Sequence, residues 1–245
     1  MRLKLRLAAM GTGLLVCLPL HYLWKLAGFH SPWPRRFLGW IGYAAGMRVE
    51  VEGTPLRANA LLVSNHVSWL DIMVIAGVTG AAFVSKDDVA RWPVFGWLSR
   101  LNNTVFVARG ERGAVRGQAD SLRAALATGQ PVALFPEGTT GNGRDLLPFR
   151  ASLLAALFPP PPDIRVQPVA VDYGAAAGDI AWLGEEAAGA NAKRVLSRAG
   201  TTWVVIRFLE PVDPAAAGDR KALAALTRSR IAAALGASAA PTDPV

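Results

Sequence analysis

The chain carries two kinds of hydrophobic pattern. Before residue 48 it is almost continuously apolar, and after it short apolar runs alternate with longer stretches of helical periodicity. The short runs, rich in β-branched residues, predict strands at residues 60–64, 82–85, 104–108, 132–135, 166–172 and 203–209. The periodic stretches predict helices at residues 68–77, 94–100, 114–128, 151–158 and 219–235. This alternation indicates an α/β fold with a mixed, mainly parallel sheet flanked by helices.

Residues 7–24 form an uncharged segment of 18 residues near the N-terminus. This length is at the lower edge of the ~17–25 residues that span a bilayer. Three basic residues precede the segment, as in a secretory signal peptide, but no convincing small-residue cleavage site follows. We therefore expect an uncleaved membrane anchor, although Pro19 and His21 interrupt a clean span.

A second apolar segment, residues 37–47, is too short to cross a bilayer. It contains Trp40 and Tyr43, which suit the headgroup level, so an interfacial helix is expected, with an ordinary core helix as the alternative. A polar stretch follows at residues 48–53 and leads into a Gly-Thr-Pro turn that begins at Gly53. The expected organisation is therefore a membrane anchor over residues 1–48, a folded domain over residues 49–235 and a disordered tail over residues 236–245.

The charge of the chain is concentrated at its N-terminal end. The formal net charge is +8, and residues 1–50 hold seven basic residues and one acidic residue. The remaining 195 residues hold 19 basic and 17 acidic residues and are therefore nearly neutral. This distribution favours contact with an anionic membrane surface and argues against nucleic-acid binding.

Cysteine and histidine are too scarce for a metal site. Cys17 is the single cysteine, so neither an intramolecular disulfide nor a cysteine-based metal site is expected. Of three histidines, His66 alone lies outside the apolar N-terminal segment. We therefore predict no bound metal.

His66 and Asp71 are the first candidates for acid–base chemistry, because imidazole titrates near neutral pH and a carboxylate can orient it. Five positions on a regular helix turn about 500°, which leaves the two side chains roughly 140° apart. They can meet only if His66 precedes the helix and Asp71 lies in its first turns. Asn65 is then a plausible helix N-cap. Without further information, a structural histidine is the alternative.

Glu137 lies in a Pro-Glu-Gly turn directly after a predicted strand. Ligands of α/β proteins bind at such strand ends. The glycine-rich run at residues 138–143 resembles a phosphate loop, but Arg144-Asp145 replaces the lysine and hydroxyl residue of a Walker motif. An ordinary glycine-rich turn is the alternative.

Arg109 follows the predicted strand at residues 104–108. An arginine at a strand end can clamp a phosphate or carboxylate, whereas a solvated side chain is the simpler interpretation.

Together these motifs resemble the glycerolipid acyltransferase family, which includes 1-acylglycerol-3-phosphate acyltransferases. The similarity consists of NH-x4-D at residues 65–71, a second block at 103–109, FPEGT at 135–139 and VQPVAV at 166–171. The similarity extends over about residues 53–214. It implies that the folded domain at residues 49–235 is an acyltransferase domain. The resemblance implies that His66 is the general base and that Asp71 orients it. It also implies acceptor contacts for six residues: Asn65, Arg109, Glu137, Gly138, Thr139 and Thr140.

By this resemblance, the protein is a membrane-bound O-acyltransferase that uses an acyl-ACP or acyl-CoA thioester as donor. The acceptor is the hydroxyl of a lyso-lipid, no acyl-enzyme forms, and no cofactor is bound. The high content of alanine and arginine suggests a bacterial source, hence the inner membrane with a cytoplasmic active site. An inactive lipid-binding scaffold and a lipid or thioester hydrolase are the alternatives.

Two positions depart from the family pattern. Asn103 replaces the usual glycine of the second block, and Thr140 stands where FPEGTR or FPEGTS is common. The loss of a cation weakens the case for a phosphate-bearing acceptor. Bacterial lyso-ornithine lipid acyltransferases have a similar TTG-x-G run. Lysophosphatidic acid and lyso-ornithine lipid therefore both remain as acceptors.

Overall fold

The computed structural model describes residues 1–86, 90, 93–107 and 114–236. The described strands are β1 (Met47–Glu52), β2 (Ala60–Ser64), β3 (Ala82–Lys86), β4 (Val105–Val107), β5 (Val132–Leu134), β6 (Arg165–Asp172) and β7 (Thr202–Phe208). The described α-helices are α1 (Arg2–Leu26), α2 (Trp33–Ala44), α3 (Leu70–Thr79), α5 (Pro93–Leu101), α6 (Ala114–Leu126), α7 (Ala177–Ile180), α8 (Ala188–Ser197) and α9 (Arg220–Leu235). Two 3-10 helices, η1 (Ala151–Leu157) and η2 (Gly174–Ala176), complete the described elements.

The strands form one seven-stranded sheet in the order β1-β7-β6-β2-β5-β3-β4. Every pair is parallel except β6–β7, so a block of five parallel strands meets a block of two at one antiparallel junction. The predicted mixed, mainly parallel sheet is confirmed. β2 lies between β5 and β6 and is buried along its whole length.

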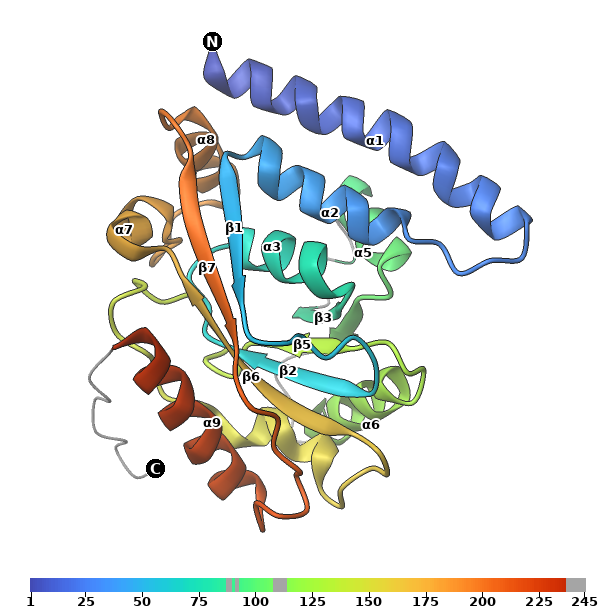
Figure 1. The fold of residues 1–245 in the computed structure, drawn as a ribbon, viewed down its shortest axis with the longest axis vertical. Helices are drawn as coiled ribbons and strands as arrows, with labels where there is room; N and C mark the ends of the chain where they lie inside the picture. Colours follow the sequence, from blue (N-terminus) through green and yellow to red (C-terminus); the bar gives the residue numbers. More distant parts are fainter. Residues whose placement is uncertain (87–89, 91–92, 108–113, 237–245) are drawn as a thin grey trace.

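Each face of the sheet carries its own hydrophobic core, because successive side chains of a strand point to opposite faces. Ala60 and Leu62 of β2 belong to the core beneath α3, whereas Leu61 and Val63 belong to the core that includes α6, η1 and α9. Figure 1 shows the resulting layers: α1, α2 and α3 lie on one side of the sheet, and α6 and α9 lie on the other.

The N-terminal helices form an antiparallel pair on top of α3 (Figure 1). Trp40 Nε1 of α2 donates a hydrogen bond of 2.7 Å to the carbonyl oxygen of Ala9 in α1. A close contact between Gly39 and Gly77 joins α2 to α3. With 25 residues, α1 is long and apolar enough to cross a membrane, yet it packs along α2.

The structure differs from the predicted elements in several places. Residues 47–52 form β1, which pairs with β7, so the expected boundary at residue 48 falls inside a strand. Their alternation of apolar and charged residues fits an edge strand, although the charges had indicated a polar boundary between the anchor and the domain. Residues 151–157 form a 3-10 helix in place of the predicted α-helix, and neither α7 nor α8 was predicted. The expected disordered tail lies outside the described residues beyond Gly236.

Candidate active site

His66 lies in the loop between β2 and α3, at the carboxyl end of a central strand. Its Nδ1 is 2.8 Å from Asp71 Oδ2, and Asp71 lies in the first turn of α3. The prediction that the two side chains meet across the helix entrance is therefore confirmed. The carboxyl ends of parallel strands are the usual place for ligands in such folds.

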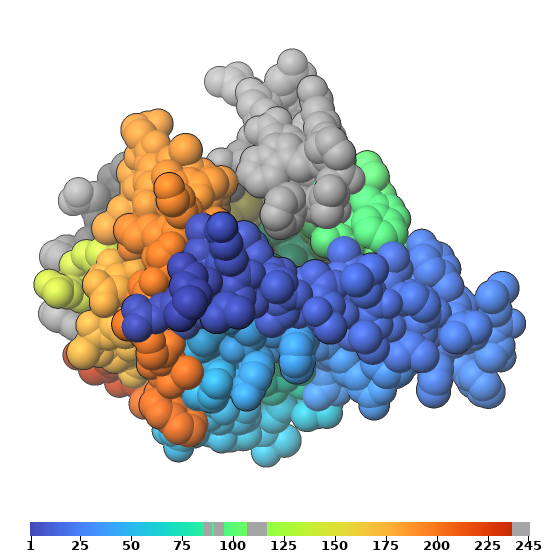
Figure 2. All heavy atoms as spheres, turned by 90° about the horizontal axis from the view of Figure 1, so that it is seen from above, coloured from blue at the N-terminus to red at the C-terminus, as the bar shows by residue number. Residues whose placement is uncertain are grey.

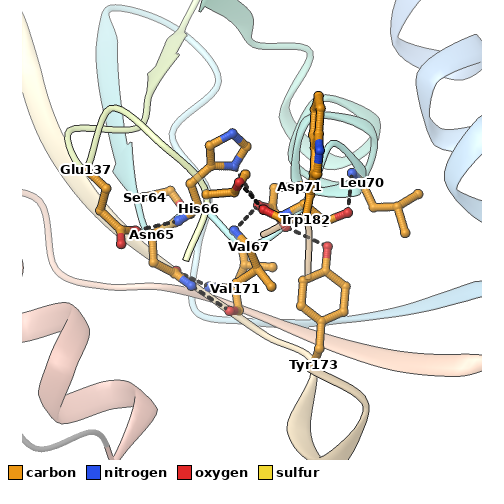
Figure 3. Close-up of polar contacts among 12 residues, drawn as sticks. Ser64, Asn65, His66, Val67, Leu70, Asp71, Glu137, Val171, Tyr173 and Trp182 are labelled. Atoms are coloured by element: carbon orange, nitrogen blue, oxygen red, sulfur yellow. Dashed lines mark hydrogen bonds and ion pairs between the residues drawn. The ribbon is translucent and has the colours of Figure 1, made fainter. Parts of the chain in front are cut away.

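Asp71 organises this loop through four hydrogen bonds (Figure 3). Oδ2 accepts from His66 Nδ1 and from the backbone N–H groups of Val67 at 2.7 Å and Ser68 at 2.9 Å. Oδ1 accepts from the Tyr173 hydroxyl at 2.6 Å. The carboxylate is completely buried, so these donors replace the water that it would otherwise bind. The geometry of the loop is therefore set around Asp71.

Tyr173 was not identified from the sequence. It follows β6, which pairs with β2 in the register Val169↔Ser64, so its side chain lies beside the His66 loop. Burial, followed by the charge of Asp71, raises the pKa of Tyr173 well above its usual value. The phenol consequently stays protonated and donates to Asp71. Residue 173 directly follows the strand predicted at residues 166–172, and functional residues of α/β proteins gather at such strand ends, so the sequence held a signal for Tyr173.

The His66 imidazole is poised to accept a proton. A carboxylate only accepts hydrogen bonds, so Nδ1 carries the hydrogen and Nε2 keeps its lone pair in the neutral ring. Nε2 has no hydrogen-bond partner among the described residues. The ring is 18% exposed and stacks on Phe135 with centroids 3.9 Å apart and planes 11° apart. Its orientation is thus fixed on one face while its edge remains accessible.

Asn65 does not cap α3, contrary to the expectation. Its side-chain amide exchanges two hydrogen bonds with the Val171 backbone, 2.9 Å to the carbonyl oxygen and 2.8 Å from the N–H. α3 begins without a side-chain cap. Asn65 therefore ties the end of β2 to β6, because the buried polar backbone at the strand end needs partners.

Glu137 is buried beneath the His66 loop and joins two segments to it. Oε1 accepts a 2.7 Å hydrogen bond from the His66 backbone N–H, and Oε2 accepts a 3.0 Å bond from the Leu147 N–H. Burial, followed by a smaller contribution from Asp71, raises the pKa of Glu137 to about 7, and the two N–H donors oppose this. Glu137 therefore links the loop at His66 to the segment at Leu147.

The remaining predicted acceptor contacts differ in their surroundings. Gly138 has a left-handed φ of +72°, and a side chain there would meet the Arg150 guanidinium at 3.2 Å. Thr139 is exposed. The Thr140 hydroxyl donates to the Trp182 carbonyl oxygen. Arg109 lies outside the described residues.

The segment from Ala181 through α8 packs against the residues that follow His66, and this contact was not predicted from the sequence. The Trp182 N–H donates to the Val67 carbonyl oxygen at 3.0 Å, and Trp69 Nε1 donates to Asn191 Oδ1 at 3.1 Å. Figure 3 shows Trp182 beside the start of α3. Seen from above, α1 lies across this face, with the α7–α8 segment beside its N-terminal part (Figure 2).

A base held by a buried carboxylate can deprotonate a hydroxyl group or a water molecule. Within the described part of the chain, no serine hydroxyl or cysteine thiol hydrogen-bonds to His66. The arrangement therefore favours direct attack by a bound hydroxyl over attack by an enzyme nucleophile.

Comparison with known proteins identifies the family. Residues 48–172 match the Acyltransferase family. The chain is 37% identical over 255 residues to a lyso-ornithine lipid O-acyltransferase of Brucella abortus, covering 96% of this chain and 94% of the relative. It is 39% identical over 100 residues to a 1-acyl-sn-glycerol-3-phosphate acyltransferase of Neisseria gonorrhoeae, covering 40% of this chain and 39% of the relative.

The fold also matches a crystal structure. The 1-acyl-sn-glycerophosphate acyltransferase PlsC of Thermotoga maritima superimposes with a TM-score of 0.64 at 24% identity, covering 83% of this chain and 77% of that one. The sheet, its flanking helices and the motifs around His66 and Asp71 thus agree with the sequence matches: the chain belongs to the acyltransferase family whose members acylate lyso-lipids.

Proposed function

We propose that this protein is a membrane-bound O-acyltransferase that moves a fatty acyl group from an acyl-ACP or acyl-CoA thioester to the free hydroxyl of lyso-ornithine lipid. One observation carries the chemistry: His66 Nδ1 is held by buried Asp71 while Nε2 has no described partner. This is the arrangement that a general base requires.

In the proposed reaction, His66 Nε2 takes the proton of the acceptor hydroxyl as its oxygen attacks the thioester carbonyl carbon. The C–O bond forms, a tetrahedral intermediate collapses, and the C–S bond breaks. The imidazolium returns its proton to the departing sulfur, so the products are an ester and a free thiol. Asp71 stabilises the imidazolium through its hydrogen bond to Nδ1.

Two observations support lyso-ornithine lipid over lysophosphatidic acid as the acceptor. The Brucella abortus relative, which matches along nearly its whole length, is named for that activity. Thr140 also places no cation after the FPEGT motif, and its hydroxyl is engaged by the Trp182 carbonyl oxygen. An acceptor without a phosphate group requires no cation at this position.

The contacts of α1 support a helix that lies in the membrane surface. α1 contacts the folded domain near its N-terminal end through Arg6, and it packs along α2, where Trp40 donates to the Ala9 carbonyl oxygen. A helix held along its length cannot cross the bilayer without drawing α2 into it. Its outer side is apolar, with Leu15 76% exposed. We propose the bacterial inner membrane, with the active site on the cytoplasmic side where acyl thioesters are made.

The test is transfer of a labelled acyl group by the purified full-length protein. Each donor, acyl-ACP and acyl-CoA, is combined with lyso-ornithine lipid or lysophosphatidic acid, and His66→Ala serves as the inactive control. We expect labelled ornithine lipid. Preferential acylation of lysophosphatidic acid would overturn the proposed acceptor. Release of free fatty acid alone would indicate a hydrolase, and lack of turnover with every pair would indicate a scaffold.

A further inference from the structure

Four arginines gather where the N-terminal end of α1 meets the first residues of β1 and β7. Arg2 and Arg6 belong to α1, Arg48 to β1, and Arg198 follows α8. Arg6 lies within electrostatic reach of the other three. Figure 2 shows the first turns of α1 against the segment that contains α8 and the start of β7. Four like charges at one place create a positive potential that attracts an anion.

Neutral groups hold the guanidinium groups in place. Arg6 donates to the Gly200 carbonyl oxygen at 2.7 Å, Arg48 donates to that of Met47 at 2.9 Å, and Arg198 donates to the Thr202 hydroxyl at 2.8 Å. None of the four forms an ion pair with a carboxylate of the described chain. By contrast, Arg194 and Arg207 each pair with acidic residues.

An apolar groove begins at the same cluster. It has a volume of about 420 Å³ and is lined by residues of α2, α3, β1 and β7, with Arg48, Tyr43 and Trp203 among them. The Arg48 guanidinium lies 3.9 Å from the centre of the Tyr43 ring. Tyr43 and Trp203 are 54% and 66% exposed, which is unusual for large aromatic side chains. A groove of this volume falls within the ~300–1,000 Å³ of small-molecule sites.

We propose that this groove and its arginines bind an anionic phospholipid of the bilayer, with the phosphate on the guanidinium groups and an acyl chain in the groove. A soluble phosphate would satisfy the arginines but leave the aromatic walls exposed. A lipid satisfies both, since aromatic rings and arginines favour the headgroup level. The site is separate from His66, and the inference rests on the proposed location of α1 at a membrane.

The test measures binding of short-chain phosphatidylglycerol to the purified full-length protein in neutral detergent by native mass spectrometry and calorimetry. We expect saturable binding of one lipid per chain. The double variant Arg2→Gln/Arg48→Gln should bind the lipid about 25-fold more weakly, because each basic residue near an anionic lipid contributes about fivefold to the affinity. Glycerol phosphate, which lacks the chains, should bind far more weakly. His66→Ala should bind normally, so loss of acyl transfer does not affect the result.

Two further variants make the test specific. Lys4→Gln/Lys25→Gln removes two exposed charges from the same helix and should retain the lipid site. Trp203→Ala removes an exposed wall of the groove without opening the core, and should weaken lipid binding but not glycerol phosphate binding. Equal loss in the lysine variant, or equal affinity for glycerol phosphate, would overturn the proposal. So would an arginine variant with unchanged lipid binding and a raised KM for the acyl donor, which would indicate a donor-docking surface.

Discussion

Tyr173 and His66 bind opposite oxygens of the same carboxylate. The phenol donates 2.6 Å to Asp71 Oδ1, and the imidazole lies 2.8 Å from Oδ2. Although Tyr173 is 102 residues from Asp71 in sequence, the pairing of β6 with β2 brings it beneath the loop. Tyr173 thus holds Asp71 in place, and Asp71 in turn orients His66, the proposed base.

Tyr173→Phe should lower kcat with little change in KM, because the phenol touches Asp71 and not the substrate. Without that donor, the Asp71 carboxylate is held less firmly and aligns the His66 imidazole less well. Steady-state kinetics of the wild type and the variant, with thermal unfolding as the control for folding, provide the measurement. A loss of thermal stability with unchanged kcat would mean that Tyr173 only fills the core.

His66→Ala should reduce kcat by about 10²–10⁴, the usual contribution of a general base. The ring is partly exposed and its backbone N–H remains bonded to Glu137, so the fold should survive. Acyl transfer and circular dichroism of the same preparation provide the measurement. A variant that keeps wild-type turnover would exclude His66 as the base.

Glu137 should make stability fall as pH rises from about 4.5 to about 7. Its pKa is raised to about 7 by burial in the folded state, so over this interval the folded chain binds more protons than the unfolded chain. This difference in the pKa of Glu137 between the unfolded and folded states corresponds to roughly 3 kcal/mol in the free energy of unfolding. Urea unfolding of wild type and Glu137→Gln across this range tests it, and the variant should lack this decline. Parallel pH profiles for the two proteins would contradict the prediction.

The sequence was sufficient where the decisive contacts are local. The spacing of His66 and Asp71 was enough to place the first before α3 and the second in its first turn. Asn65 was misassigned because its partner, Val171, is 106 residues away and only the β2–β6 pairing brings them together. β1 was missed because edge strands tolerate charges that otherwise mark linkers.

Gly77→Ala should destabilise the protein although alanine favours helices. A Cβ at residue 77 of α3 would lie 2.7 Å from the Gly39 Cα of α2, and backbone cannot move aside without shifting the helix. Such overpacking typically costs about 1–3 kcal/mol and should exceed the gain in helix propensity of about 1 kcal/mol.

Gly117→Ala provides the matched control for this contact. Gly117 is exposed on α6, and a Cβ there meets nothing within 4 Å. The control should therefore gain up to about 1 kcal/mol from helix propensity alone. Chemical unfolding of both variants in the same detergent gives the comparison. If Gly77→Ala were as stable as Gly117→Ala, α2 would not be held against α3 at Gly39, and the groove between these helices would lose its floor.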